Sequence, residues 1–166
     1  MVDSTALGNA GEHLVMAHLL AQGFQAFMAD RGNTAFDISC VDGRCHSLIR
    51  VKTTSSNMVK WSAKKDGKIF LDQRDEGDFV ALVDLRNSVF NAPIYIVPSH
   101  VVATVLIEGD EYYHSFPKKD GTPRKRTKLR GVYLTGAPKP TDINWGYHKI
   151  WGHYLNAWDQ LREKTT

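Results

Sequence analysis

The chain has 166 residues, of which 42% are hydrophobic and 23% charged, as expected for one soluble globular domain with a full hydrophobic core. No apolar run approaches the length of a membrane span, and the N-terminus lacks a basic region followed by a hydrophobic stretch, so we expect a cytoplasmic protein. Two cysteines are too few for a disulfide framework and lack the partners of a metal site, which favours free thiols over a bridge.

The net charge of +3 is unevenly distributed along the chain. Residues 117–130 contain seven basic side chains and one acid, so this basic loop carries +6 and the rest of the chain −3. A localised positive charge suits a polyanion, and we expect the loop to bind nucleic acid; a solvated charged loop is the alternative. The basic side chains expected to make these contacts are Lys118, Lys119, Arg124, Lys125, Arg126, Lys128 and Arg130.

An amphipathic helix is predicted over residues 4–23. Its apolar residues at helical spacing are Leu7, Ala10, Leu14, Ala17 and Ala21. Gly23 is placed to take the left-handed conformation that ends a helix. Asn9 can cap a helix whose third residue is Glu12, so a capping box is one structural explanation for that acid.

A strand at residues 24–29 and a polar turn at 30–33 are predicted to lead into a central β-hairpin around Asp42-Gly43. Alternation places Asp37, Ser39, His46, Leu48, Arg50 and Lys52 on one face, and Phe36, Ile38, Cys40, Cys45, Ile49 and Val51 on the other. A two-residue loop would offset Asp37 from Lys52 by about 13 Å, whereas a four-residue loop sets Asp37 opposite Arg50. The longer loop or a bulge is therefore favoured if the charged face is a site, and a simply solvated face is the alternative.

Residues 53–68 are polar and are predicted to leave the core as an excursion. Trp61 lies among lysines there, so its ring could stack on a base while the ammonium groups contact phosphates. A surface tryptophan that covers a small apolar cluster is the alternative.

Two nearly continuous apolar runs, at residues 78–85 and 93–98, are predicted to be central strands buried on both faces. Ser99 can cap a short helix that continues through Leu106. Residues 108–130 are predicted to form a long polar connection that contains the basic loop, and residues 132–134 a short edge strand.

A final helix is predicted over residues 141–164, with a stripe of aromatic side chains along it. A packing face is the favoured interpretation of this stripe; a nucleic-acid stacking platform, or a surface for a protein partner or a homodimer, is the alternative. Together the elements predict one α/β domain over residues 1–166, with a mixed central β-sheet flanked by helices. Its parts are a core at about 8–106, the basic loop at about 108–130 and the aromatic helix at about 141–164.

Three side chains from separate predicted elements are suited to metal-assisted cleavage of a phosphodiester bond. Asp37 can bind Mg²⁺, which prefers oxygen ligands, and Glu12 can complete the shell directly or through water. Lys52 can position or deprotonate the attacking water and offset the charge of the phosphate. The sequence therefore predicts a catalytic set made of Glu12, Asp37 and Lys52.

Three short motifs follow one another along the chain: Gly11-Glu12, Phe36-Asp37-Ile38 and Ile49-Arg50-Val51-Lys52-Thr53-Thr54. In these motifs the chain resembles the small bacterial members of the PD-(D/E)XK nuclease superfamily, and the resemblance covers about residues 8–105. It implies a restriction-endonuclease-like core, Mg²⁺ or Mn²⁺ bound by Asp37 and Glu12, and endonuclease activity on DNA.

Arg50 departs from this pattern, because the superfamily has its second metal-binding acid at this position and a guanidinium cannot coordinate a cation. Arg50 can grip a phosphate beside an active metal site, which is favoured because Glu12, Asp37 and Lys52 are all present. It can instead pair with Asp37, which would leave an inactive DNA-binding module or a subunit of a larger nuclease or defence complex. A third interpretation is an interaction or immunity protein that binds its partner through the aromatic helix.

Overall fold

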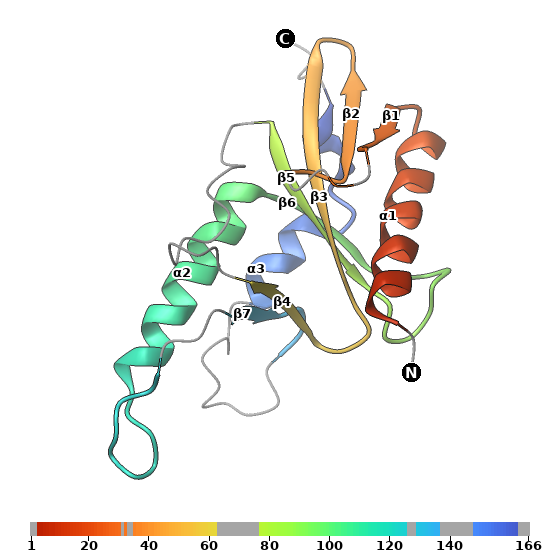
Figure 1. The fold of residues 1–166 in the computed structure, drawn as a ribbon. Coiled ribbons are helices and arrows are strands. Elements are labelled where there is room, and N and C mark those ends of the chain that lie inside the picture. Colours follow the sequence, from red (N-terminus) through yellow and green to blue (C-terminus); the bar gives the residue numbers. More distant parts are fainter. Residues whose placement is uncertain are drawn as a thin grey trace.

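The computed structural model describes residues 3–30, 32, 35–62, 77–125, 129–136 and 148–162 (Figure 1). In chain order, the elements are α1 (Ser4–Ala21), β1 (Gln25–Met28), β2 (Ile38–Asp42), β3 (Cys45–Thr54), β4 (Met58–Ser62), β5 (Asp78–Asp84), β6 (Ile94–Pro98), α2 (Ser99–Ser115), β7 (Leu129–Tyr133), α3 (His148–Trp151) and two 3₁₀ turns, η1 (Gly152–Tyr154) and η2 (Trp158–Leu161). None of the helices in this described part combines the length and the hydrophobicity needed to cross a membrane.

A five-stranded mixed sheet lies at the centre of the molecule, in the order β1-β2-β3-β5-β6. The β3–β5 pair is parallel and the other neighbours are antiparallel. Every residue of β5 is buried, as its continuous apolar run predicts for a central strand. A separate two-stranded sheet pairs β4 with β7. The predicted α/β class with a mixed sheet and flanking helices is therefore confirmed.

Two hydrophobic cores cover the two faces of the main sheet (Figure 1). On one face, Val15 and Leu19 of α1 pack against Ile49 of β3 and its neighbours. On the other face, Val102 of α2 packs with Leu82 of β5 and with the small β4–β7 sheet. The sheet is thus enclosed by α1 on one side and by α2 on the other.

The first helix forms where predicted, but it buries a different face. Its buried residues are Gly11, Val15 and Leu19, whereas the predicted Ala10, Ala17 and Ala21 are exposed. Alanine favours a helix on either surface, so it is a poor indicator of the buried face. Gly23 has a φ of 88° and ends the helix as predicted.

The hairpin has the register of the longer predicted loop. Val41 pairs with His46, which places Asp37 opposite Arg50. The pairing continues by one further step to Asp42 and Cys45, so the turn itself is Gly43-Arg44. Gly43 has a φ of 58° in the first central position, where a type II′ turn needs glycine. Both cysteines are free thiols, as expected.

The predicted excursion at residues 53–68 is wrong in part, because β4 occupies its middle and returns to the core. The predicted polar connection after residue 106 is also wrong in part, since α2 continues to Ser115. Ser99 is the first helical residue and Pro98 occupies the capping position, with no side-chain cap. The strand near residues 132–134 is confirmed as β7.

The predicted C-terminal helix is not continuous. A four-residue α3 is followed by two 3₁₀ turns, and between these turns Asn156 has a φ of 51°, which no helix accommodates. Trp151 is fully buried in the core on the α2 side, and its indole donates a hydrogen bond to the Tyr133 carbonyl at 2.9 Å. Trp158 is buried in the other core, where it stacks on His18. Trp151 and Trp158 therefore form packing contacts, as favoured, and residues 141–147 of the predicted aromatic helix lie outside the described residues.

Candidate active site

Asp37 is held firmly at the start of β2. Its backbone N–H donates to the Ile49 carbonyl at 3.0 Å, and its own carbonyl accepts the N–H of Ala29 at 2.8 Å. The side chain is also fixed, because Oδ2 accepts the backbone N–H of Val51 at 2.7 Å. Asp37 is thus tied to both neighbouring segments, and its carboxylate has a defined position beside β3.

Arg50 and Lys52 lie on one face of β3, in the register rows of Val80 and Leu82. This is the α2 face of the sheet, because Val80 and Leu82 belong to the core on that side. Arg50 pairs directly across from Asp37, and both cations are half-buried. The predicted face of the hairpin is therefore confirmed for these side chains.

Glu12 reaches Asp37 from the opposite side of the sheet. It lies on α1, which packs on the other face, and it is half-buried. Glu12 and Asp37 line the same cavity beside the connection from β1 to β2, and the charge of Asp37 acts on Glu12. The predicted capping role of Glu12 is wrong, since α1 begins eight residues earlier, at Ser4, and Asn9 lies inside it.

The electrostatics of these groups show that they interact. Burial raises the pKa of Glu12, the charge of Asp37 raises that pKa further, and His13 acts in the opposite direction. Burial lowers the pKa of Lys52, the charge of Arg50 lowers that pKa further, and Asp37 acts in the opposite direction. Asp37 is therefore the common neighbour of an acid and a base that are both shifted towards their neutral forms.

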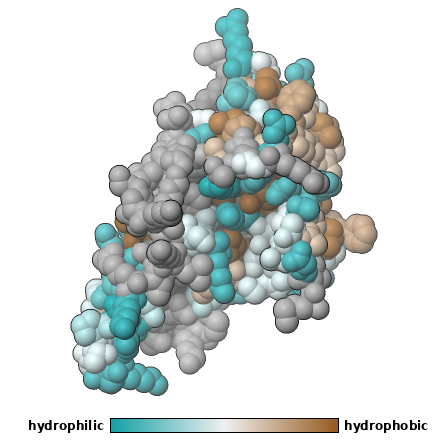
Figure 2. All heavy atoms as spheres, viewed as in Figure 1, coloured by the Kyte–Doolittle hydropathy of each residue, from teal (hydrophilic) through white to brown (hydrophobic). Residues whose placement is uncertain are grey.

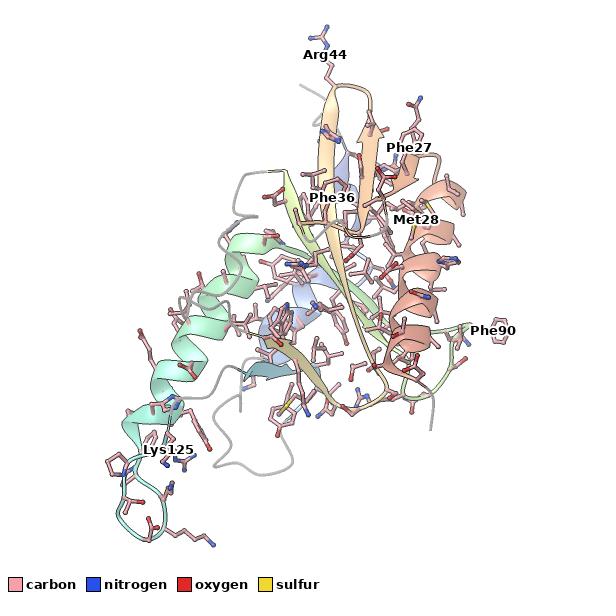
Figure 3. All side chains as sticks on the ribbon, in the orientation of Figure 1. Phe27, Met28, Phe36, Arg44, Phe90 and Lys125 are labelled. Carbon is pink, nitrogen blue, oxygen red and sulfur yellow. The ribbon has the colours of Figure 1, made fainter. Side chains whose placement is uncertain are left out.

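A cavity of about 590 Å³ opens between α1 and the connection from β1 to β2. Its α1 wall is formed by Thr5, Asn9, Glu12 and His13, and its other described residues are Met28, Ala29, Asp30, Gly32, Phe36 and Asp37. Figure 3 labels Met28 beside the upper part of α1 and Phe36 over the strands of the sheet. Neither Arg50 nor Lys52 belongs to the described lining. The acids Glu12 and Asp37 therefore line the cavity, whereas the two cations lie on β3 outside it.

Sequence reasoning missed the other polar residues of this cavity. Thr5, Asn9 and His13 are four residues apart and so share one face of α1 with Glu12 beside them. This spacing is visible in the sequence and could have indicated a polar wall. Asp30 comes from the predicted polar turn, and only the tertiary structure brings it to α1.

Glu12 and Asp37 are two carboxylates that could bind a metal ion, and a third protein ligand is not found among the described residues. In the described part of the chain, no three His, Cys, Asp or Glu side chains are arranged to hold a metal ion. Mg²⁺ commonly retains several waters and uses one or two carboxylates, so Glu12 and Asp37 suit such an ion. Arg50 takes the position of the second acid and cannot replace it as a ligand.

Trp61 does not lie in the candidate site or on the surface. It is only 2% exposed and packs in the core on the α2 side, so its ring cannot stack on a nucleic-acid base. Alternation along β4 explains this, because Val59 and Trp61 point inward while Lys60 is exposed. The prediction that Trp61 binds nucleic acid is therefore wrong.

The basic loop follows α2 and lies far from the cavity. Lys118, Lys119 and Lys125 are exposed, and Figure 3 places Lys125 at the opposite end of the molecule from Met28 and Phe36. The guanidinium of Arg124 lies 4.0 Å from the ring centre of Tyr113. Arg126 and Lys128 lie outside the described residues, and Arg130 is described only by its pairing with Trp61 in the β4–β7 sheet.

No protein-family model matches this chain, and a search of curated proteins found no match. Two similar solved structures are a Holliday junction resolvase from Archaeoglobus fulgidus and a bacterial homing endonuclease, I-Ssp6803I. The resolvase is 16% identical with a TM-score of 0.52, over 95% of this chain and 98% of the other. The homing endonuclease is 10% identical with a TM-score of 0.50, over 94% and 90%. These similarities show the fold, and the predicted restriction-endonuclease-like core is therefore confirmed.

Proposed function

We propose that this protein is a metal-dependent endonuclease that hydrolyses phosphodiester bonds in DNA. The observation that carries the proposal is the position of Asp37 between Glu12 and Lys52 on a nuclease fold: its charge acts on both groups, and burial shifts both towards their neutral forms. Charged groups kept in an unfavourable state beside a cavity are typical of functional sites. The two similar structures, an endonuclease and a resolvase, support the same class of reaction.

Glu12 and Asp37 would hold the Mg²⁺ or Mn²⁺ ion. Their two carboxylates line the same cavity, and the charge of Asp37 raises the pKa of Glu12. The hydrogen bond from Val51 leaves the second oxygen of Asp37 for a ligand. Bound there, the ion would supply Lewis-acid polarisation of the phosphate and a more acidic water.

Lys52 is suited to handle the proton of the attacking water. Its lowered pKa increases the fraction of neutral amine, which can accept a proton, and the charge of Asp37 acts on this amine. Arg50 is two residues away on the same face, and its guanidinium can bind a phosphate oxygen with two parallel hydrogen bonds. In this arrangement Arg50 binds the substrate and does not bind the metal.

The basic loop would bind DNA at a distance from the cut. Three exposed lysines lie there, beside the exposed rings of Tyr112 and Phe116 at the end of α2. Figure 2 shows this projection as a largely hydrophilic surface. Arg124 contributes less, because its guanidinium already packs on Tyr113. A combined Lys118→Ala, Lys119→Ala and Lys125→Ala variant should weaken DNA binding and flatten its salt dependence.

A second candidate function, an inactive DNA-binding module, is favoured by one observation. Arg50 lies directly across β2–β3 from Asp37, in the position from which it could neutralise the carboxylate. In that case no metal would bind, and the nuclease fold would serve only to bind DNA.

The test is cleavage of supercoiled, single-stranded and branched DNA by the purified protein with Mg²⁺ or Mn²⁺. We expect cleavage by the natural protein and none by Asp37→Ala or Lys52→Ala variants of equal stability. A pure protein that cuts none of these substrates with either ion would contradict the proposal.

Arg50→Glu distinguishes the two candidates. If Arg50 binds substrate in an active enzyme, the variant should lose activity and bind DNA more weakly. Activity that appears only in the variant would identify the natural protein as an inactivated nuclease that binds DNA.

A further inference from the structure

Gly11 has an unusually close neighbour across the contact between α1 and β3. A Cβ atom built on Gly11 would overlap the hydroxyl oxygen of Thr53, and would lie 2.9 Å from Cβ and 3.0 Å from Cγ2 of the same residue. The three nearest atoms to that Cβ all belong to Thr53, whereas Gly8, one turn earlier on the same helix, has open space around it. The requirement for glycine is therefore specific to position 11.

Thr53 is part of a rigid strand and has little freedom to yield. It lies on β3 and pairs with Val83 of β5, and every residue of β5 is buried. Its hydroxyl is buried and has no hydrogen-bond partner among the described residues, as expected if the backbone of α1 lies directly upon it. The helix must therefore move outward if a side chain is added at Gly11.

The two residues in this contact are the immediate neighbours of two residues of the candidate site. Gly11 precedes Glu12, and Thr53 follows Lys52. The separation of α1 and β3 at this contact therefore also affects where Glu12 lies relative to Asp37 in the cavity that both residues line.

We propose that Gly11 is a positioning residue: by letting α1 rest directly on Thr53, it places the Glu12 carboxylate beside Asp37. The expected effect on catalysis rests on the proposed function. The effect of Gly11 on the position of Glu12 does not depend on any activity. The contact also gives a physical reason for the glycine of the Gly11-Glu12 pair, since only a residue without a side chain permits so close an approach.

The test is a double-mutant cycle with a matched control. The variants are Gly11→Ala, Thr53→Gly, the two combined, and Gly8→Ala as the control on the same helix. Displacing a group at a catalytic site by about 1 Å can cost about a hundredfold in rate, so Gly11→Ala should lower kcat by roughly that factor with KM for DNA little changed. The combined variant should regain the kcat of Thr53→Gly alone, because all three contacting atoms are gone. Gly8→Ala should match the natural protein.

Crystal structures of the same variants give a readout that needs no activity. In Gly11→Ala, α1 should lie farther from β3 and the Glu12 and Asp37 carboxylates farther apart, and the combined variant should restore both distances. If the natural protein shows no cleavage, the proposed function is wrong. The distances in these crystal structures would still test whether Gly11 positions Glu12.

Three results would overturn the inference. One is a folded Gly11→Ala variant with unchanged kcat or unchanged carboxylate separation. Another is an equal loss in Gly8→Ala, which would indicate a general effect of alanine in α1. If Gly11→Ala alone does not fold, the combined variant carries the test, and a folded combined variant with displaced carboxylates would refute the proposal.

Discussion

Two charged clusters in this molecule respond to burial in opposite ways. At the end of β5, the carboxylate of Asp84 accepts hydrogen bonds from Arg86 at 2.6 Å from Nη2 and 2.9 Å from Nε, and a third from the Arg86 backbone. Burial raises the pKa of Asp84, but the hydrogen bonds and charge of Arg86 outweigh it, so the pKa is lowered overall. The hydrogen bond to Asp84 in turn raises the pKa of Arg86. Both groups are stabilised in their charged forms.

At the candidate site the same kinds of group are shifted towards neutrality. The pKa of Glu12 is raised and that of Lys52 is lowered, in each case chiefly by burial. The Asp84–Arg86 pair thus stabilises its own charges, whereas at the candidate site burial of Glu12 and Lys52 outweighs the attraction of opposite charges, as is typical of functional sites. Variants in the two clusters should therefore have opposite effects on activity and on stability.

The largest effect is expected at Lys52. Replacing it with methionine keeps an unbranched apolar stem and removes the amine, so cleavage should fall by about 10²- to 10⁴-fold, the usual contribution of a positioned acid or base. The free energy of unfolding should be unchanged or higher, because burial disfavours the charge in the natural protein. Steady-state cleavage kinetics and urea unfolding measure the two quantities. Loss of stability in proportion to activity would indicate a structural role for Lys52.

A reversed outcome is expected at Asp84. Asp84→Asn keeps the shape of the side chain but loses the charge-assisted bonds to Arg86, which should cost about 2–3 kcal/mol of unfolding free energy. The kcat of the folded variant should remain that of the natural protein. Calorimetric unfolding and cleavage assays below the Tm test this, and a marginal change in stability would show that the pair is merely a surface contact.

The smallest effect is a difference in pH dependence. Because the pKa of Asp84 is lowered on folding, its stabilising contribution is complete above its ordinary value of 3.8 and is lost as the pH falls through the lowered pKa. Because the pKa of Glu12 is raised, its cost is absent below its ordinary value of 4.5 and grows as the pH rises through the raised pKa. In urea unfolding against pH, Asp84→Asn should flatten the acid side, and Glu12→Gln should gain stability on the neutral side. If the free energy of unfolding changes with pH in the same way in both variants, the proposed difference between the two clusters is wrong.

The sequence predicted the parts of the molecule that depend on local periodicity and chain order. The hairpin, the buried strands β5 and β6 and the register that sets Asp37 opposite Arg50 follow from alternation and turn chemistry. These local patterns are strong because successive side chains of a strand point to opposite faces of the sheet.

The remaining features depend on contacts between distant segments. Trp61 is surrounded by lysines in the sequence but is buried because β4 pairs with β7, more than sixty residues later. The buried face of α1 was mispredicted because the closest approach is made by Gly11, which no hydrophobicity pattern marks. That Glu12 and Asp37 line one cavity depends on how α1 packs beside the connection from β1 to β2, which is a tertiary contact that no local pattern marks.

The most direct test of the central claim is a comparison of Mn²⁺-dependent stability in the two clusters. A cation that binds between Glu12 and Asp37 in the folded state should raise the Tm of the natural protein, by an amount that corresponds to about 2.7 kcal/mol at a hundred times its Kd. Asp84→Asn should show the same increase from its lower starting Tm, and Asp37→Asn, which keeps an oxygen for the Val51 hydrogen bond, should show none. An increase of equal size in Asp37→Asn, or no increase in the natural protein, would contradict a metal site at these carboxylates.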